Sequence, residues 1–469
     1  MTRIPLSGTA ISRETLDALK ARVRGVVLSD GDDGYDAARS VWNAMIDRRP
    51  AVIVRCAGAA DVKAAVDFAR ERGAVLSVRG GGHNIAGSAV CDSGVMIDLS
   101  AMKSVRIDPV ARTARIEPGV TLGEFDREAQ SFGLVTPTGI NSTTGIAGLT
   151  LGGGFGWISR KFGLTADNLV GADIVTADGH LLHVSEAEHS DLFWAIRGGG
   201  GNFGVVTSFK FRLHALGPQV MSGLLVYPLA QAVDMLKRYR EIMTAAPDEL
   251  SCWFVLRSAP PLPFLPQEVH GTGIIAFAAC YAGPMDAAEV AMKPLREMGK
   301  PIADVIGPHP FAGWQAVLDP LLTPGARNYW KSHSFTTLND GAIATLVEYA
   351  GKLPSAECEL ACAQLGGAIN RVPAAATAYP HRDIGFVLNI HTRWREPADD
   401  AACIAWARSL FESCKPFATG GVYVNFMPEE EHDRVASAYL GNSKRLAAIK
   451  ANYDPHNLFQ MNQNIRPTP

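Results

Sequence analysis

The chain has no long hydrophobic run and no leader-like N-terminus. It contains no stretch of about 18 consecutive apolar residues, the minimum for a helix that crosses a bilayer. Its first residues lack the apolar segment of a secretory signal. We therefore expect no membrane partner and a cytoplasmic location. Hydrophobic residues make up 47% and charged residues 19%, which is typical of a globular protein with a large core.

Charge clusters and paired cysteines are also lacking. The formal net charge is -3 and no block of Lys and Arg stands out, so we predict no nucleic-acid partner. The eight cysteines are scattered without a C-x-x-C pair, which argues against a disulfide framework and a structural zinc site. We expect buried free thiols. His180, His183 and His189 do not form a convincing metal set with any nearby carboxylate, so we expect them to be solvated and predict no metal site.

Glycine, in contrast, is abundant and clustered. The 46 glycines include dense groups within residues 77–89, 143–179 and 192–213. Gly199, Gly201 and Gly204 satisfy G-x-G-x-x-G, but a strand-like segment follows where the dinucleotide fingerprint needs a helix. The motif G-x-x-x-x-G-K-[ST] is absent. The sequence therefore predicts neither a Rossmann nor a Walker-type nucleotide site.

The three glycine clusters suggest a different way to hold phosphate. Successive glycines allow several backbone N–H groups to face one concavity, which can bind an anion without lysine. Each hydrogen bond to a charged acceptor contributes roughly 1.5–3 kcal/mol, so a few of them would hold a diphosphate. Three such loops indicate an extended ligand that lies between elements. The alternative is that each cluster is only a set of tight turns.

The pattern of expected elements changes near residues 217 and 420. The first part mixes short strands with helices, whereas the second alternates long strands with helices and predicts a broad, mostly antiparallel sheet covered on one face. We predict an α+β fold with domains at 1–217 (core about 46–217) and 218–420 and a C-terminal segment at 421–469. The main expected elements are strands at 51–56, 74–79, 249–257, 271–283 and 384–394 and helices at 61–73 and 121–133.

Four motifs, in order along the chain, resemble those of one enzyme family. They are "SVRGGGHNIAGSA" (77–89), "GINSTTGIAGLTLGGG" (139–154), "WAIRGGGGNFGVVTSF" (194–209) and "YDPHNLFQMNQNI" (453–465). Together they resemble the berberine-bridge-enzyme-like family of FAD-linked oxidases in the vanillyl-alcohol oxidase superfamily, and bacterial members of the 6-hydroxy-D-nicotine oxidase type. The resemblance covers residues 35–466. It implies a two-part PCMH-type FAD-binding domain, a substrate domain with a large antiparallel sheet covered by helices, and a C-terminal segment that returns to the first domain.

The resemblance also implies the cofactor and its attachment. In such enzymes the histidine after the glycines is bonded through an imidazole nitrogen to the 8α-methyl group of FAD, and the matching residue is His83. The alternative for His83 is a loop histidine that caps a carbonyl. The positions expected to bind FAD are His83, Arg79, Gly80, Gly81, Gly82, Asn84, Gly87, Ser88, Thr144, Gly145, Gly148, Gly153, Gly154, Asn168, Val205, Tyr453, Asn462 and Asn464.

Two positions depart from the family pattern. Many relatives attach FAD a second time through a cysteine, and Asn141 occupies the matching position, so we expect a single covalent bond. Thr144 lies three residues later. In the family, valine is common at this position, where a small residue helps to admit oxygen to the flavin. Oxidase behaviour is still expected, and a dehydrogenase stays open.

Candidates for catalysis come from the second domain and the returning segment. Tyr423 and Asn425 match the family's Y-x-N-[YF] motif, but Phe426 stands where a tyrosine is often proposed as base. If this segment is a strand, residues 423 and 425 share one face and 424 and 426 the other. Gln364 and Lys331 match positions near the substrate in relatives, although a backbone-bound glutamine and a surface lysine are the alternatives. His381 and Arg382 are expected to fix a loop.

The resemblance predicts an FAD-dependent oxidase. It would oxidise an alcohol or amine carbon of a small molecule by hydride transfer to flavin N5 and reduce O2 to H2O2. A neutral amine would need no catalytic base. The alternatives are a flavin dehydrogenase that uses another electron acceptor and a flavin-binding protein without turnover.

Overall fold

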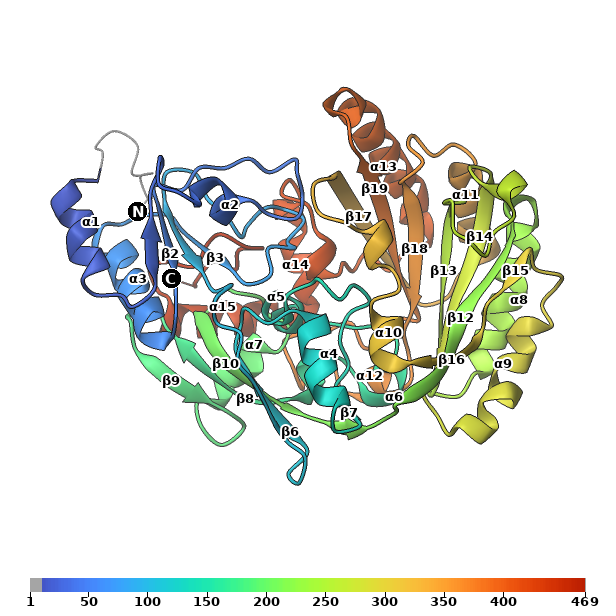
Figure 1. The fold of residues 1–469 in the computed structure, drawn as a ribbon, viewed down its shortest axis with the longest axis horizontal. Helices are drawn as coiled ribbons and strands as arrows, with labels where there is room; N and C mark the ends of the chain where they lie inside the picture. Colours follow the sequence, from blue (N-terminus) through green and yellow to red (C-terminus); the bar gives the residue numbers. More distant parts are fainter. Residues whose placement is uncertain (1–10, 469) are drawn as a thin grey trace.

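Two sheet-containing parts lie side by side, and the C-terminal helices return to the first of them (Figure 1). The computed structural model describes residues 11–468. Residues 1–10 of the predicted first domain, and residue 469 of the predicted C-terminal segment, lie outside the described residues. No helix within residues 11–468 is long and apolar enough to cross a membrane. The predicted α+β class with a large antiparallel sheet is confirmed.

The N-terminal part begins with a four-stranded sheet in the order β1-β2-β4-β3. β2 and β3 run parallel to β4, and helix α3 connects them, so the predicted strands at 51–56 and 74–79 and the helix at 61–73 are confirmed. β4 is buried along its whole length. The elements are β1 (Val26–Leu28), β2 (Val52–Arg55), α3 (Ala59–Glu71), β3 (Leu76–Arg79) and β4 (Val95–Asp98).

A second, five-stranded antiparallel sheet follows in the order β5-β6-β10-β8-β9. The glycine loop after helix α7 leads directly into β10, which is the context that the sequence predicted when it excluded a Rossmann site. The strands are β5 (Val105–Asp108), β6 (Thr113–Ile116), β8 (Leu169–Val175), β9 (Leu181–Val184) and β10 (Val205–Arg212). The helices of this part are α4 (Leu122–Gln130), α5 (Ile146–Leu151), α6 (Ser159–Phe162) and α7 (Ser190–Ile196).

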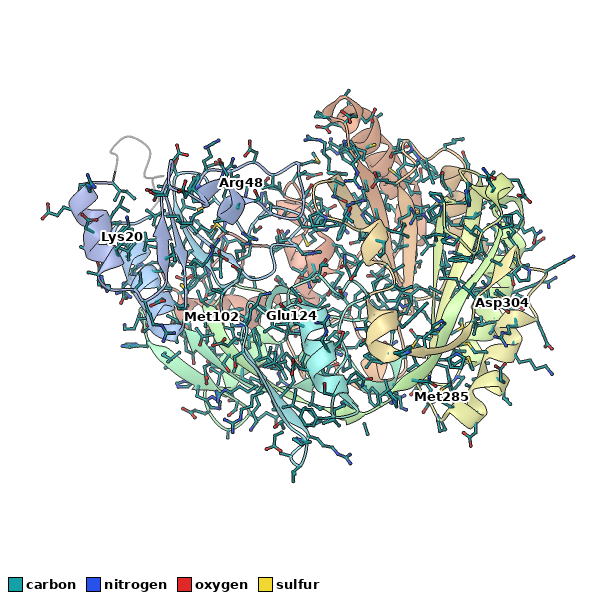
Figure 2. The ribbon with its side chains drawn as sticks, in the orientation of Figure 1. Lys20, Arg48, Met102, Glu124, Met285 and Asp304 are labelled. Carbon is teal, nitrogen blue, oxygen red and sulfur yellow. The ribbon has the colours of Figure 1, made fainter. Side chains whose placement is uncertain are left out.

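Helix α4 shows how local sequence fixes an element near the middle of the molecule. Thr121 accepts a hydrogen bond from the Glu124 backbone, and the Glu124 carboxylate accepts one from the Thr121 N–H at 2.8 Å. This reciprocal cap satisfies donors that the helix itself leaves unpaired. In Figure 2, Glu124 lies beside α4, between Met102 of the N-terminal part and Met285 of the second part.

The second part is an eight-stranded antiparallel sheet in the order β15-β12-β14-β13-β18-β19-β17, with β16 paired to β12. Among its central strands, β14 carries a continuous apolar run that is buried on both faces, and β19 is buried throughout although it includes polar residues. The strands are β12 (Gln219–Pro228), β13 (Leu250–Ser258), β14 (Gly273–Tyr281), β15 (Ala303–Asp304), β16 (Gly307–Pro310), β17 (Arg327–Phe335), β18 (Glu359–Gln364) and β19 (Phe386–Trp394).

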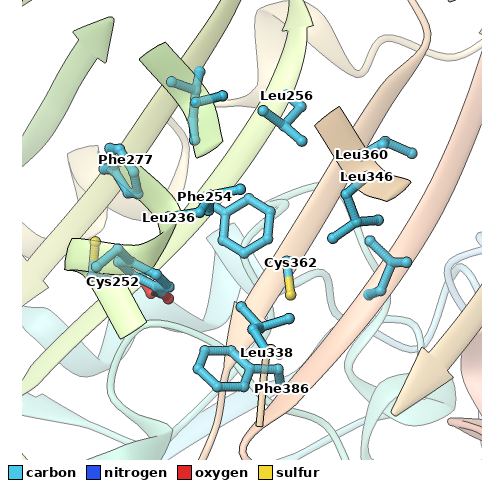
Figure 3. Packing of buried hydrophobic residues seen from close by; sticks show 14 of the residues in the cluster. Leu236, Cys252, Phe254, Leu256, Phe277, Leu338, Leu346, Leu360, Cys362 and Phe386 are labelled. Carbon is cyan, nitrogen blue, oxygen red and sulfur yellow. Dashed lines mark hydrogen bonds between the residues drawn. The ribbon is translucent and has the colours of Figure 1, made fainter. Parts of the chain in front are cut away.

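Helices cover one face of this sheet, on the side away from the N-terminal part (Figure 1). Alternate residues of each strand, such as Cys252, Phe254 and Leu256 of β13, pack against these helices (Figure 3). The intervening residues face the opposite way, toward the N-terminal part. The covering helices are α8 (Ala232–Ala245), α9 (Ala288–Arg296), α11 (Asp340–Ala350) and α13 (Asp400–Cys414).

The remaining segments close the gap between the two parts. The returning segment does not form the strand that the alternation argument assumed. Val424–Phe426 is a short 3-10 turn. Helix α15 then packs against α7, and its Lys450 forms a buried ion pair with Asp454 at 2.7 Å. The other helices are α1 (Arg13–Lys20), α2 (Tyr35–Arg39), α10 (Phe311–Gln315), α12 (Ala368–Arg371), α14 (Val435–Tyr439) and α15 (Ser443–Tyr453).

Candidate active site

A cavity of about 400 Å³ lies between the two parts. Its walls include the glycine loops at 80–84 and 200–204, the helix N-terminus at 144–148, the uncovered face of the eight-stranded sheet and the returning segment 423–426. Segments from three widely separated regions of the sequence therefore meet at one site. Within the described chain, no group of three His, Cys, Asp or Glu side chains could hold a metal ion.

The first glycine loop offers a row of unused donors. The N–H groups of Gly81, Gly82, His83 and Asn84 donate to no acceptor in residues 11–468, although all four residues line the cavity. Gly81 also packs directly against the backbone of Gly145, where a Cβ atom would overlap the Gly145 nitrogen. Gly82 has a φ of +70°, a conformation that favours glycine. These N–H groups suit an anionic group such as a diphosphate.

His83 is held between two threonines and an indole. Its Nε2 lies 3.1 Å from Thr143 Oγ1 and its Nδ1 lies 3.4 Å from Thr144 Oγ1. The Trp42 ring stacks on the imidazole with centroids 5.0 Å apart. Burial lowers the pKa of His83 to about 4, because the charged form would lose its hydration. The ring is therefore neutral near pH 7 and keeps a nitrogen lone pair.

The second glycine loop and the C-terminal segment form a similar polar region. Gly201 and Asn202 line the cavity, and their N–H groups also donate to no acceptor in the described chain. Asn462 Oδ1 and Gln463 Oε1 are buried without a partner, and both residues line the cavity. Buried oxygens without donors are costly unless a ligand supplies the hydrogen bond. Donors for phosphates and acceptors for ring N–H groups together fit FAD, which residues 81–84, Gly201, Asn202, Asn462 and Gln463 would hold.

Tyr423 and Asn425 form a hydrogen-bonded pair at the cavity. The Tyr423 hydroxyl oxygen accepts from the Gly154 N–H at 3.1 Å and from Asn425 Nδ2 at 2.9 Å. Burial raises the pKa of Tyr423 to about 12, although these two hydrogen bonds oppose the shift. The hydroxyl therefore keeps its proton near pH 7. Because residues 423–426 form a turn, Tyr423, Val424, Asn425 and Phe426 all line the cavity, and the predicted division onto two strand faces is wrong.

The sheet face of the cavity carries one polar row across four strands. The cross-strand register aligns Arg257 with Glu359, Glu359 with His391, and His391 with Trp330. Arg257 Nη1 lies 2.6 Å from Glu359 Oε2, and His391 Nδ1 lies 3.2 Å from Glu359 Oε1. Asn389 follows in the next row, beside small and apolar residues.

Most of the predicted cofactor positions come together at this cavity. Those that line it are Gly80, Gly81, Gly82, His83, Asn84, Ser88, Thr144, Gly145, Gly148, Val205 and Asn462, together with the catalytic candidates Tyr423 and Asn425. Their roles toward FAD and substrate stay predictions.

The structure does not place Gln364 or Lys331 at the cavity. Gln364 lies on the helix-covered face of β18, on the side of Leu360 and Cys362, where its Nε2 donates to the Met243 carbonyl at 3.1 Å. Lys331 likewise points to the helix side of β17, and its Nζ lies 2.5 Å from Glu431 Oε1. A sequence position near the site does not determine which sheet face a side chain occupies, so neither residue lines the cavity, and a role toward the substrate stays a prediction.

Seven predicted cofactor positions also lie away from the lining. The Arg79 guanidinium donates to the Ala38 carbonyl, Asn168 Nδ2 donates to the Phe162 and Leu164 carbonyls, and the Tyr453 hydroxyl donates to Asp191 at 3.0 Å. The other four are Gly87, Gly153, Gly154 and Asn464. Asn464 Oδ1 is buried without a partner in the described residues, like the amide oxygens of Asn462 and Gln463. The roles of these seven residues toward FAD stay predictions.

His381 and Arg382 fix a loop, as predicted. Arg382 forms a buried, two-pronged ion pair with Asp167, with contacts of 2.7 and 2.8 Å. His381 Nε2 lies 3.0 Å from the Ala438 carbonyl. These contacts connect the loop before β19 to both the N-terminal part and α14.

Sequence reasoning missed a group of residues that connect the two walls. Trp42 stacks on His83 and contacts Trp330 edge-on, with centroids 5.7 Å apart. Asn43 donates to the Ile85 carbonyl of the glycine-loop segment and to the Asn328 carbonyl of β17, at 3.2 and 3.0 Å. The sequence did contain a signal for the polar row. Polar residues stand among largely apolar neighbours in these strands, at Arg257, Glu359, Asn389 and His391.

Comparisons with known proteins agree with this architecture. Residues 50–185 match the FAD binding domain family, and residues 422–466 match the berberine and berberine like family. The (R)-6-hydroxynicotine oxidase of Paenarthrobacter nicotinovorans is 31% identical over 459 residues, covering 95% of this chain and 97% of that protein. Berberine bridge enzyme-like 6 of Arabidopsis thaliana is 30% identical over 446 residues, 87% of this chain and 79% of that protein.

A solved structure extends the likeness to the whole fold. The crystal structure of 6-hydroxy-D-nicotine oxidase from Arthrobacter nicotinovorans has a TM-score of 0.86 at 29% identity, covering 95% of this chain and 98% of that chain. Fold, cavity and similarity define an FAD-linked oxidoreductase that acts on a small molecule. More specifically, the chain belongs to the berberine-bridge-enzyme-like family, as its four motifs predicted.

Proposed function

We propose that the protein is an FAD-dependent oxidase whose flavin is attached covalently, and only once, through His83. Residues 81–84, Gly201, Asn202, Asn462 and Gln463 would hold the FAD. The cofactor would supply, at N5, an acceptor for hydride from an alcohol or amine carbon of the substrate, with O2 as the final electron acceptor and H2O2 as the product. The observation that carries the proposal is the loop at 81–84. It combines N–H groups that have no acceptor in residues 11–468 with a neutral imidazole at one cavity.

The surroundings of His83 support a covalent attachment. Its neutral ring has a lone pair for bond formation, and the Thr143 and Thr144 hydroxyls and the Trp42 ring restrict its orientation. Asn141, which hydrogen-bonds Thr143, offers no thiol for a second attachment. The described part of the chain places every cysteine in a buried position outside the cavity lining.

The lining favours a substrate that needs no deprotonation before it is oxidised. Tyr423 has a pKa of about 12 and its oxygen already accepts two N–H bonds, so its O–H is a donor toward the substrate. Phe426 cannot accept a proton. Glu359 is ionised and shared between Arg257 and His391. A neutral amine satisfies this arrangement best, and an alcohol would have to pass its proton to water.

The attachment is tested with a His83→Ala variant and a matched His180→Ala control, which removes an exposed histidine outside the cavity. The acid-precipitated wild-type and control proteins should stay yellow, and mass spectrometry should locate the flavin on the peptide containing His83. The His83→Ala pellet should be colourless. Yellow colour that survives acid treatment in His83→Ala would contradict the attachment.

A flavin dehydrogenase is the second candidate, and Thr144 favours it. Thr144 lines the cavity next to His83, where relatives often have valine. Anaerobic mixing with alcohols and amines should first bleach the flavin absorbance. Stopped-flow mixing of the reduced protein with O2 then distinguishes the candidates, because an oxidase regains its colour with each turnover and a dehydrogenase regains it slowly.

A further inference from the structure

The polar row of the sheet is a second binding feature, distinct from the groups that would hold FAD. It consists of Arg257, Glu359 and His391 on β13, β18 and β19, with Asn389 in the adjacent row. All four side chains line the cavity and come from rigid, paired strands. The rest of this wall is apolar or small; it includes Val226, Trp253, Val255, Ile274, Ala276 and Ala361.

His391 lies between the Glu359 carboxylate and Asn328. Its Nδ1 faces Glu359 Oε1 at 3.2 Å and its Nε2 faces Asn328 Oδ1 at 3.2 Å. The Asn328 Nδ2 donates to the Ala326 carbonyl at 2.8 Å, which fixes the orientation of this amide. Both ring nitrogens of His391 therefore already contact protein oxygens.

Arg257 is the cation of this row that can meet a ligand. Burial would raise the pKa of Glu359, but the charge of Arg257 and the hydrogen bond with His391 lower it to about 2. Glu359 is therefore a carboxylate that contacts both Arg257 and His391. In residues 11–468, no Lys or Arg other than Arg257 and no acidic side chain other than Glu359 lines the cavity.

Two polar groups of this wall have hydrogen-bonding atoms without partners. Arg257 Nη2 has no partner in residues 11–468, since Nη1 contacts Glu359 and Nε donates to the Ser258 carbonyl at 3.2 Å. Asn389 is 8% exposed, and its buried Oδ1 has no donor within the described residues. A guanidinium N–H edge and an amide oxygen without partners in an apolar cavity are stabilised when a ligand brings an anion and a donor.

We propose that Arg257 determines substrate specificity by binding a carboxylate group of the substrate. Glu359 is a positioning residue that holds the guanidinium on the cavity face. Asn389 accepts a hydrogen bond from an N–H or O–H of the same molecule. The inference rests on the proposed function and makes it more specific: the substrate is an amine or alcohol with an apolar or aromatic body and a carboxylate. One unused guanidinium edge, with no second Lys or Arg side chain from residues 11–468 in the lining, matches a monovalent carboxylate better than a phosphate.

Benzoate and benzamide form a matched pair of probes, because they share size and shape but only benzoate is charged and neither has an oxidisable alcohol or amine carbon. Their dissociation constants are measured by calorimetry on the holoprotein. The wild type should bind benzoate at least about tenfold more tightly than benzamide. Arg257→Gln should weaken benzoate by about 10- to 100-fold and leave benzamide unchanged. Arg106→Gln is the control, because Arg106 is exposed on β5. This variant should keep the wild-type ratio of the benzoate and benzamide dissociation constants.

Two further variants keep the test valid if Arg257→Gln fails to fold. Glu359→Gln removes the one acidic group that lines the cavity within residues 11–468. Because the glutamine amide oxygen can still accept a hydrogen bond from Arg257 Nη1, the guanidinium stays in place, and benzoate should bind several-fold more tightly. A purely structural role for the pair would weaken both probes equally. The double variant Arg257→Gln/Glu359→Gln removes both charges of the pair, so no buried carboxylate is left without its partner. It should lose most of the preference for benzoate over benzamide.

The outcomes separate this inference from the proposed function. A wild-type protein that is yellow but binds benzamide as well as benzoate, or binds neither, overturns the inference alone. The inference is also overturned if the Arg257 variants keep the wild-type ratio of the benzoate and benzamide dissociation constants, or if Glu359→Gln binds benzoate more weakly. A protein purified without flavin overturns the proposed function, whatever the probe ratio is.

Discussion

The two walls of the cavity are built by different means. On the N-terminal side, backbone N–H groups of glycine loops are exposed to the cavity, and side chains contribute little beyond His83 and Asn84. On the opposite side, alternate side chains of paired strands supply the polar groups, which are Arg257, Glu359, His391 and Asn389. If FAD occupies the glycine-loop side as proposed, that side contacts a cofactor that is the same for every substrate, whereas strand side chains can change without altering the fold. We therefore expect the sheet wall to determine which substrate is bound.

The largest expected effect comes from filling the contact between the first glycine loop and the N-terminus of α5. A Gly81→Val substitution places side-chain atoms where the Gly145 backbone lies, and backbone cannot move aside as a flexible side chain can. We expect complete loss of bound flavin, measured as the ratio of visible to ultraviolet absorbance of the purified protein. Gly441→Ala, where a Cβ atom would meet nothing within 4 Å, is the control and should keep its full flavin content. A yellow Gly81→Val protein would show that the backbone wall tolerates side chains.

This wall could be predicted from the sequence because its residues are contiguous. Residues 80–84 form one loop after a strand that was also predicted, so the position of His83 beside the glycines of the cavity could be predicted, whereas its attachment to FAD stays a prediction. The sheet wall could not be predicted, because its row joins residues far apart in sequence. Arg257 and Glu359 are 102 positions apart and meet only through the register of β13 and β18.

The next largest effect contrasts the two faces of a single strand. Leu256 of β13 is fully buried under the helices, whereas its neighbour Val255 lines the cavity. Leu256→Ala should lower the free energy of unfolding by about 2–5 kcal/mol, because it removes buried atoms and leaves a void. Val255→Ala enlarges an existing cavity and should cost less than about 1 kcal/mol. Guanidinium titration followed by tryptophan fluorescence measures the free energy of unfolding of both variants. Equal decreases in the two variants would mean that the two faces are packed alike.

A third contrast separates two buried amides on opposite faces of the sheet. Gln364 lies under the helices, and Asn389 lines the cavity. With an amine or alcohol that bleaches the flavin, Asn389→Leu should raise KM about tenfold, the cost of one lost hydrogen bond. Gln364→Leu should leave KM within about twofold of wild type. If Gln364→Leu alone raises KM, the original assignment of Gln364 to the substrate is correct.

Gln364 lies away from the cavity for a simple physical reason. Side chains alternate between the faces of a strand, so a shift of one residue moves a side chain from the cavity to the core. Glu359, Ala361 and Ala363 lie on the cavity side of β18, and Leu360, Cys362 and Gln364 lie on the helix side. Each side carries one polar residue, so the sequence alone does not tell whether Glu359 or Gln364 faces the ligand. Tyr423 and Asn425 were found because their motif is contiguous, although the assumed strand is a turn.

The smallest expected effect is the pH dependence of stability that arises from Glu359 on the sheet wall. The pKa of Glu359 is lowered from 4.5 to about 2, because Arg257 and His391 oppose the effect of burial. A carboxylate with a depressed pKa stabilises the fold fully above pH 4.5, and this contribution is lost as the pH falls toward 2. The melting temperature of the wild type should therefore fall more steeply than that of Glu359→Gln between about pH 5 and pH 3. Glu297→Gln, which changes an exposed carboxylate at the end of α9, should follow the wild type. Parallel curves for all three proteins would mean that Arg257 is not held by an ionised Glu359, which would contradict the positioning role assigned to Glu359.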